Sequence, residues 1–301
     1  MRKFSFFFTG LLLTISFTHS QPKISFTFDD GITRDHVGYT FEEWNQLLLD
    51  KLNAKGVQST FFVTGSNKTD KKGKYLLKSW DNAGHSIANH TYSHPNFNSK
   101  NISSENFREE LIGADTIIRQ YRNYKKLFRF PYLKEGDTPS KVAEIRSILR
   151  ELEYQNGYVT IDASDWYIDS RLRKRLDENP NADIEVFKEF YLAHLLERAN
   201  FYENLSFQLE GRHIRHTLLL HHNLAAALFF DDLVDMFRKE GWEIVSSTEA
   251  YTDPVYKKQT SYAGESLIWA LARDSGRFEK MLRYPAEDSR YEKEKMDALG
   301  L

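Results

Sequence analysis

Seven short apolar segments, separated by longer amphipathic ones, constrain the fold of this chain more than any other feature of its sequence. Each apolar segment has the length of a buried strand, and the residues between them show the apolar spacing of helices. The predicted strands are 24–28, 59–64, 85–89, 127–130, 157–162, 216–221 and 242–246. The predicted helices are 41–55, 73–83, 103–120, 139–153, 183–209, 224–240 and 262–275. This alternation predicts an α/β protein with a parallel sheet covered by helices, in an incomplete or irregular (β/α) barrel rather than two domains.

One connection is longer than a βα unit needs. About fifty residues, 167–215, separate the fifth and sixth predicted strands. They are charged and helical in pattern, with a turn at Asn179 and Pro180. We predict a helical insertion on the surface; a cap that shapes a substrate groove is the weaker alternative. Beyond about residue 250 the chain is amphipathic and then polar, which predicts a C-terminal helical tail.

The first twenty residues have the pattern of a signal peptide. Arg2 and Lys3 precede the apolar stretch 4–17, and small residues follow at 18–20. We therefore predict cleavage near Ser20 and an exported protein, periplasmic or secreted, whose catalytic domain is 21–301 with its core at about 24–250. No later segment is apolar enough to predict a membrane span in the mature chain.

Charge and cysteine content exclude several classes of function. The formal net charge of the 301 residues is −2, which is not the basic footprint of a nucleic-acid-binding protein. The chain has no cysteine, so disulfides, cysteine nucleophiles and cysteine zinc ligands are excluded. The sequence leaves the oligomeric state open.

Residues that could take part in catalysis or metal binding follow five of the predicted strands. Ligands of βα proteins collect at the carboxyl ends of parallel strands, so residues from distant parts of the chain are expected at one mouth. These residues are Asp29, Asp30 and Gly31; His90 and His94; Arg129 and Tyr132; Asp162, Asp165 and Trp166; and His221. Each group alone is also typical of an ordinary turn or loop, and their joint placement is what favours a site.

Two histidines and a carboxylate suit a divalent cation with a position left open for water. A bound cation would also explain two adjacent aspartates, whose charges repel each other. The glycine after them lets the chain bend, so that both carboxylates can reach the mouth.

The five motifs resemble, in the same order, those of the polysaccharide deacetylase family, which is carbohydrate esterase family 4 with the NodB homology domain. They read TFDDG (27–31), HTYSH (90–94), RFPY (129–132), DASDW (162–166) and LLH (219–221). The resemblance spans about residues 24–250 and implies a distorted (β/α)7-type barrel. It also implies a metal-dependent hydrolase that removes acetyl groups from a polysaccharide or oligosaccharide.

The resemblance implies a role for each matching residue. Asp30, His90 and His94 would hold the metal, with Zn²⁺ the first candidate and Co²⁺, Ni²⁺ or Mn²⁺ as alternatives. Asp29 would be the general base, positioned by Arg129, and the backbone N–H of Tyr132 would stabilise the oxyanion. His221 would be the general acid, oriented by Asp165. Trp166 and Leu219 would form the apolar pocket for the acetyl methyl group.

One motif departs from the family pattern. The last motif usually continues with an aspartate after its histidine, and here His221 is followed by His222 and Asn223. We assign the acid to His221 because it keeps the register of the leucines, while His222 is the alternative.

The last prediction concerns the substrate. An acetylated glycan outside the cell or in its envelope is the expected partner, with N-acetyl groups preferred. The alternatives are an O-acetyl esterase on a glycan such as xylan, an amidohydrolase on a non-sugar amide, and a binding protein that kept only the fold.

Overall fold

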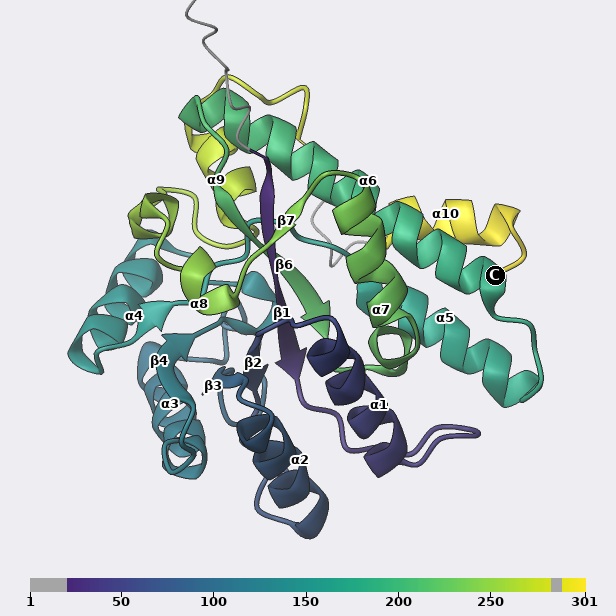
Figure 1. Cartoon of the computed structure of the whole chain (residues 1–301). Coiled ribbons are helices and arrows are strands. Elements are labelled where there is room, and N and C mark those ends of the chain that lie inside the picture. The colour runs from purple at the N-terminus through teal and green to yellow at the C-terminus, as the bar shows by residue number, and fades with distance from the viewer. Residues whose placement is uncertain (1–20, 283–288) are drawn as a thin grey trace, which may run out of the picture.

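The computed structural model describes residues 21–282 and 289–301, so the predicted signal peptide at 1–20 lies outside the described residues. A parallel sheet in the order β5-β4-β3-β2-β1-β6 forms the centre, and β7 pairs with β1 (Figure 1). The strands are β1 Lys23–Asp30, β2 Thr60–Val63, β3 Ser86–Asn89, β4 Tyr124–Phe128, β5 Gln155–Asn156, β6 Arg215–His221 and β7 Glu243–Ile244.

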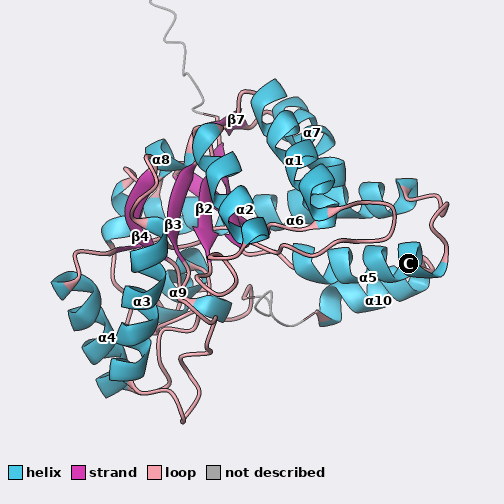
Figure 2. Ribbon diagram, turned by 90° about the horizontal axis from the view of Figure 1, so that it is seen from below, coloured by secondary structure: helices cyan, strands magenta, loops and turns pink. Residues whose placement is uncertain are grey.

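Helices connect these strands and cover the outside of the sheet (Figures 1 and 2). They are α1 Phe41–Ala54, α2 Lys71–Asn82, α3 Ser104–Ile118, α4 Pro139–Glu151, α5 Asp165–Glu178, α6 Glu185–Glu210, α7 Leu224–Lys239, α8 Ser247–Ala250, α9 Leu267–Asp274 and α10 Arg290–Ala298. The predicted helices are present with small shifts at their ends. The largest shift is in α9, which begins five residues later than predicted because Ser266 caps it by accepting a hydrogen bond from the Trp269 N–H.

The sheet curls into an open half-barrel, which confirms the predicted irregular (β/α)7-type barrel. The position of the fifth predicted strand is wrong. Only Gln155–Asn156 pairs with β4, and the predicted segment 157–162 leaves that edge after Gly157. It reaches β6 instead through a single bridge between Ile161 and Leu218, which brings the two sides of the curled sheet together.

β1 lies between β2 and β6, and its side chains alternate between two environments. Ile24, Phe26 and Phe28 are fully buried, and the Phe26 ring lies 5.1 Å from that of Phe230 on α7. Ser25 and Thr27 face the other way and donate hydrogen bonds to carbonyls of β6. Asp29 is in phase with these two residues, so the period of the strand turns its carboxylate toward the interior of the half-barrel.

The predicted insertion forms two helices that the C-terminal tail then covers. α5 and α6 lie beside α10 in both views (Figures 1 and 2). Arg198 on α6 and Glu292 on α10 are both buried and form an ion pair at 3.0 Å. The insertion begins slightly earlier than predicted, at Asp165, so a residue of the fourth motif opens its first helix. Within the described residues, no helix combines the length and the apolarity that crossing a membrane requires.

Candidate active site

The two adjacent aspartates at the end of β1 point to different partners. Asp30 and Gly31 both have positive φ, of 79° and 87°, and turn the chain sharply away from the strand. A side chain at Gly31 would bring its Cβ within 2.8 Å of Val63 Cγ2, so both the turn and the space require glycine. As a result Asp29 stays buried inside the half-barrel, while the side chain of Asp30 is about one-third exposed.

Arg129 holds the buried carboxylate of Asp29. Its Nη1 donates to Asp29 Oδ1 at 2.5 Å, and its Nε donates to the Gly157 carbonyl at 2.9 Å. The third contact is to Tyr251, whose hydroxyl accepts from Nη2 at 2.9 Å. The guanidinium carbon lies 3.9 Å from the centre of the Phe62 ring. Because each of its three guanidinium nitrogens donates a hydrogen bond, Arg129 is held rigidly and fixes the position of Asp29.

The pKa of Asp29 reflects two opposing influences. Burial raises the pKa of this carboxyl to about 6, against the charges of Arg129 and His221, which lower it. The pKa of Asp29 therefore lies closer to neutral pH than that of an ordinary aspartate.

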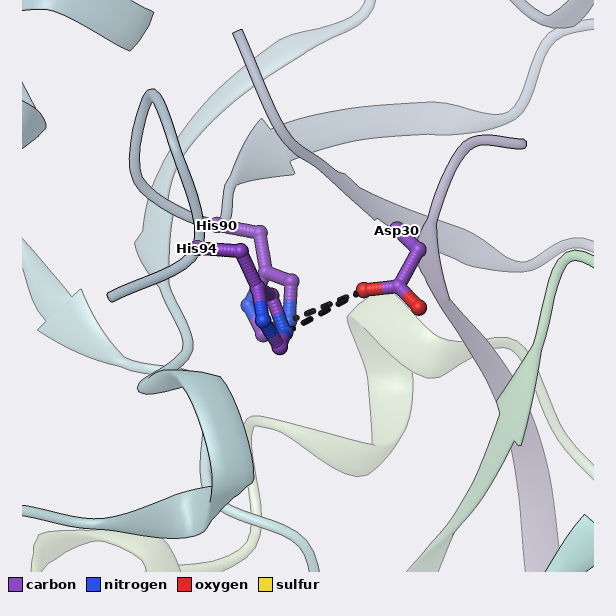
Figure 3. A group of neighbouring side chains, drawn as sticks. All are labelled: Asp30, His90 and His94. Atoms are coloured by element: carbon purple, nitrogen blue, oxygen red, sulfur yellow. Dashed lines mark ion pairs between the residues drawn. The ribbon is translucent and has the colours of Figure 1, made fainter. Parts of the chain in front are cut away.

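His90 and His94 face the carboxylate of Asp30 from the loop after β3 (Figure 3). Asp30 Oδ1 lies 3.6 Å from His90 Nε2 and 3.3 Å from His94 Nε2. The loop turns tightly because Asn89 Oδ1 accepts from the Thr91 N–H and Thr91 Oγ1 accepts from the His94 N–H. Thr91 and His94 both have positive φ, so this turn stores backbone strain at the site.

These three side chains fit a divalent metal ion. Two ligands bound about 2.0 Å from a tetrahedral ion lie about 3.3 Å apart, close to the separations found here. The carbonyl of Arg129 accepts from His90 Nδ1 at 2.8 Å, so Nδ1 carries the proton and Nε2 keeps its lone pair toward Asp30. Burial lowers the pKa of both imidazoles and keeps the rings neutral, as metal ligands must be.

His221, at the end of β6, is oriented by Asp165. Asp165 is fully buried, and its Oδ1 lies 2.7 Å from His221 Nδ1. Its Oδ2 accepts from the backbone N–H of His221 at 2.8 Å and from Asn223 Nδ2 at 3.0 Å. Burial alone would lower the pKa of His221, but the charge of Asp165 outweighs it and raises that pKa to about 10. The imidazole is therefore held protonated at neutral pH, with its Nε2 side left for the pocket.

His222 points in the opposite direction, as expected for neighbouring residues at a strand end. It is fully buried, its Nε2 lies 3.0 Å from Asn45 Oδ1, and the Trp44 and Phe61 rings lie 4.4 and 5.4 Å away. Of the two candidate histidines, only His221 lines the reaction pocket.

One pocket of about 440 Å³ collects most of the predicted site residues. Its walls include Asp29, Asp30, His90, His94, Tyr132, Trp166, Leu219 and His221. The two remaining predicted residues, Arg129 and Asp165, lie behind this wall and contact Asp29 and His221. Tyr132 sits in the short 3-10 turn Pro131–Leu133 with a φ of 55°, and its half-exposed ring packs edge-on against His94 at 4.7 Å. The structure thus brings together all ten residues to which the resemblance gave a role.

Sequence reasoning missed some residues that support this wall. Tyr251 and Phe62 hold Arg129, but no motif around either residue indicates it. Asn223 carried a usable signal, because an Asn directly before a helical segment is a typical N-cap; its side chain accepts from the Ala226 N–H and also donates to Asp165.

Known proteins are similar to part of this chain. Residues 17–157 match the family model described as polysaccharide deacetylase. This match confirms the resemblance to the polysaccharide deacetylase family for the three motifs that lie within these residues. The matched region contains Asp29, Asp30, His90, His94, Arg129 and Tyr132, while Asp165 and His221 lie beyond it.

Two curated relatives illustrate the similarity. Peptidoglycan-N-acetylglucosamine deacetylase of Bacillus cereus is 31% identical over 133 residues, which are 44% of this chain and 42% of that protein. Peptidoglycan-N-acetylmuramic acid deacetylase PdaA of Bacillus subtilis is 26% identical over 183 residues, 60% of this chain and 62% of that protein. The chain thus spans less than two thirds of the length of these relatives.

Solved structures share the fold at low sequence identity. A mutant of a carbohydrate esterase family 4 pseudoenzyme with restored enzymatic activity aligns with a TM-score of 0.54 and 20% identity, over 76% of this chain and 67% of that one. Peptidoglycan deacetylase PdaC of Bacillus subtilis aligns with a TM-score of 0.51 and 22% identity, over 77% of this chain and 91% of that one. The fold of the chain is therefore that of carbohydrate esterase family 4.

Proposed function

We propose that this chain is a metal-dependent hydrolase that removes acetyl groups, N-acetyl groups foremost, from a polysaccharide or oligosaccharide outside the cell or in its envelope. One observation carries the proposal: a buried carboxylate held by arginine, an Asp/His/His group and a protonated histidine line a single pocket. The fold alone would not carry it, because one similar structure is of a pseudoenzyme. The peptidoglycan deacetylase relatives support a glycan substrate.

The chemistry divides among the residues of the pocket. Asp30, His90 and His94 would hold the divalent ion, with zinc, cobalt, nickel and manganese as candidates. When bound, this ion polarises the acetyl carbonyl and makes water more acidic. Asp29 takes the proton of the attacking water through the carboxylate oxygen that Arg129 does not hold, which lies 3.7 Å from His90 Nε2.

The remaining steps involve the other side of the pocket. As the new C–O bond forms, the N–H of Tyr132 donates to the oxygen that becomes negative. His221 then gives its proton to the sugar nitrogen as the C–N bond breaks, which releases acetate and the amine. Trp166 and Leu219 provide the apolar wall for the acetyl methyl group. The domain organisation belongs to the same proposal, with an export signal at 1–20 and the catalytic domain at 21–301.

The test is acetate release by purified 21–301 from matched N-acetylated and O-acetylated glycans, with chelator and with each divalent metal added back. Chelator-sensitive release from an N-acetylated glycan supports the proposal. Release from O-acetylated xylan alone indicates an esterase. Release from a non-sugar amide alone would replace the glycan by that substrate class, and no metal binding at all would reject the proposal.

The adjacent histidines provide a matched pair of variants. His221→Gln is expected to lower kcat at least about 100-fold, because proton donation to the leaving nitrogen is lost. His222→Gln is expected to change kcat by less than about threefold and to lower stability by about 1–3 kcal/mol, because its buried contact to Asn45 is disturbed. Initial rates and thermal unfolding measure both effects, and the opposite order of losses would assign the acid to His222.

The charge of Asp165 sets the alkaline limit of activity in this mechanism. His221 acts only while it carries its proton, so activity should fall as the pH rises through its pKa of about 10. Asp165→Asn removes the nearest negative charge and is expected to move this limb to lower pH, in addition to lowering the rate about tenfold or more. Profiles of kcat/KM against pH for both proteins measure the shift. An alkaline limb that stays in place would contradict the assigned acid.

A further inference from the structure

A second hollow adjoins the proposed active site. It has a volume of about 560 Å³ and lies between the loops that follow β1 and β2, at the carboxyl ends of these strands. It shares Asp30 and His94 with the reaction pocket, so the two hollows meet at the Asp/His/His group. Its size is in the range of small-molecule sites, and its open shape suits a unit of a longer chain.

A nearly buried cation lines this second hollow. Lys68 is 4% exposed, and its ammonium donates to Ser66 O at 3.0 Å and Thr64 Oγ1 at 3.4 Å. Both acceptors are neutral, and an ammonium has three donors, so one N–H has no acceptor within the described part of the chain. No carboxylate among the described residues forms an ion pair with Lys68, whereas a buried charge is normally paired.

The other charges around the hollow leave it positive. Arg34 is an exposed cation of the same wall, and its backbone carbonyl is fixed by the Trp44 indole N–H at 3.0 Å. Asp70 caps α2, and Asp35 pairs with Lys72 at 2.7 Å, so these two carboxylates already have partners. Neither of them lines the hollow; Asp30 is the one carboxylate among the described residues that do, and it belongs to the Asp/His/His group.

From these contacts we infer that the second hollow is a subsite for a carboxylate-bearing sugar next to the acetylated unit. This inference rests on the proposed function and specifies its substrate class. The nearly buried Lys68 donates its free N–H to the carboxylate, and the exposed Arg34 contacts the same carboxylate from the solvent side. The hydroxyls of Thr33 and Ser66 and the amide of Asn67 suit the hydroxyl groups of the same sugar. The carboxylate could belong to a lactyl ether on the sugar or to a uronic acid.

The experiment compares four N-acetylated oligosaccharides of equal length on the metal-loaded protein. One carries lactyl ether carboxylates, one carries the same groups as amides, one alternates with glucuronate, and one is neutral. The wild type should prefer the carboxylates over the matched amide by about tenfold or more in kcat/KM, the size expected for a hydrogen bond to a charged group. Lys68→Met should lower this preference about tenfold, mainly through KM, and Lys68→Arg should restore part of it.

Two further variants keep the result decisive. Arg34→Gln changes an exposed side chain that cannot unfold the core, and it should lower the preference by a smaller factor. Lys74→Met removes an exposed lysine of α2 outside the hollow and serves as the matched control, with the preference unchanged. An equal preference in wild type, Lys68→Met and Arg34→Gln would overturn the inference. A preference for the lactyl ether alone, or for glucuronate alone, supports it and identifies the source.

Calorimetric binding of the same oligosaccharides separates this inference from the proposed function. If no oligosaccharide releases acetate but the carboxylates still bind about tenfold more tightly than the amide, the deacetylase assignment fails and the subsite stands. If acetate is released and no carboxylate preference appears in binding or turnover, the subsite fails and the deacetylase assignment stands.

Discussion

Asp29→Asn is expected to lower kcat by about 10³-fold or more while the protein still binds one divalent ion. Asn has nearly the same shape as Asp but cannot take a proton, and positioned general bases contribute about 10²–10⁴-fold to rates. The effect should lie at the upper end, because burial brings the pKa of Asp29 to about 6 and Arg129 holds its carboxylate in place. The measurement is single-turnover acetate release together with metal stoichiometry.

The Asp29→Asn substitution leaves the charge of Arg129 buried without its carboxylate, so the stability of the variant must be checked. Without the carboxylate, the buried Arg129 loses its only anionic partner among the described residues, which costs stability on the order of 3–5 kcal/mol. Gly157, Tyr251 and the Phe62 ring still hold the guanidinium, so we expect the fold to persist. Thermal unfolding of the metal-loaded variant verifies this. Wild-type rates in a folded Asp29→Asn protein would remove Asp29 from the mechanism.

His90→Ala is expected to abolish both metal binding and turnover. It removes one of three side-chain donors, and His90 is the most deeply placed of them, with 2% exposure and its Nδ1 proton fixed on the Arg129 carbonyl. Losing a ligand with such a fixed orientation should weaken affinity at least about 100-fold, since even the outer partners of metal ligands are worth 10–100-fold. Calorimetric titration with zinc, cobalt, nickel and manganese measures the loss and also ranks the metals.

His85 provides the matched control for this variant. It is also a buried histidine, at 3% exposure, but its Nδ1 accepts from the Ser59 N–H and its ring packs on Trp80, away from the Asp/His/His group. His85→Ala should lower stability by a comparable amount and leave metal stoichiometry intact. Equal metal loss in both variants would mean that unfolding, not ligand removal, explains the His90→Ala result.

The sequence predicted which residues form the site better than it predicted which residues hold them in place. Residues that directly follow a parallel strand must meet at one edge, so the positions of Asp29, His90, Arg129 and His221 in the chain are enough to group them. Tyr251 could not be grouped with them, because it follows α8 in a segment with no motif and reaches Arg129 only through the curl of the sheet. Lys68 likewise reads as an ordinary lysine in a polar loop, and only its burial marks it.

The same dependence on long-range contacts explains why the fifth strand was predicted in the wrong place. The segment 157–162 has the composition of a strand, but which strand it pairs with is a long-range property. Gly157 donates its N–H to the Phe128 carbonyl and the chain then crosses to Thr217 on β6. A local pattern records the preference for extended backbone and contains no information on this choice of partner.

Periodicity and strand-end position are local properties of the chain, so they were enough to predict the alternation of strands and helices, the open barrel and the residues that follow each strand. Tertiary structure decided which of His221 and His222 enters the pocket, how Arg129 is held, and that the C-terminal helix covers the insertion that begins at Asp165. These outcomes depend on side-chain direction and on contacts between residues more than fifty positions apart, such as Asp165 with His221, which form only once the sheet has curled.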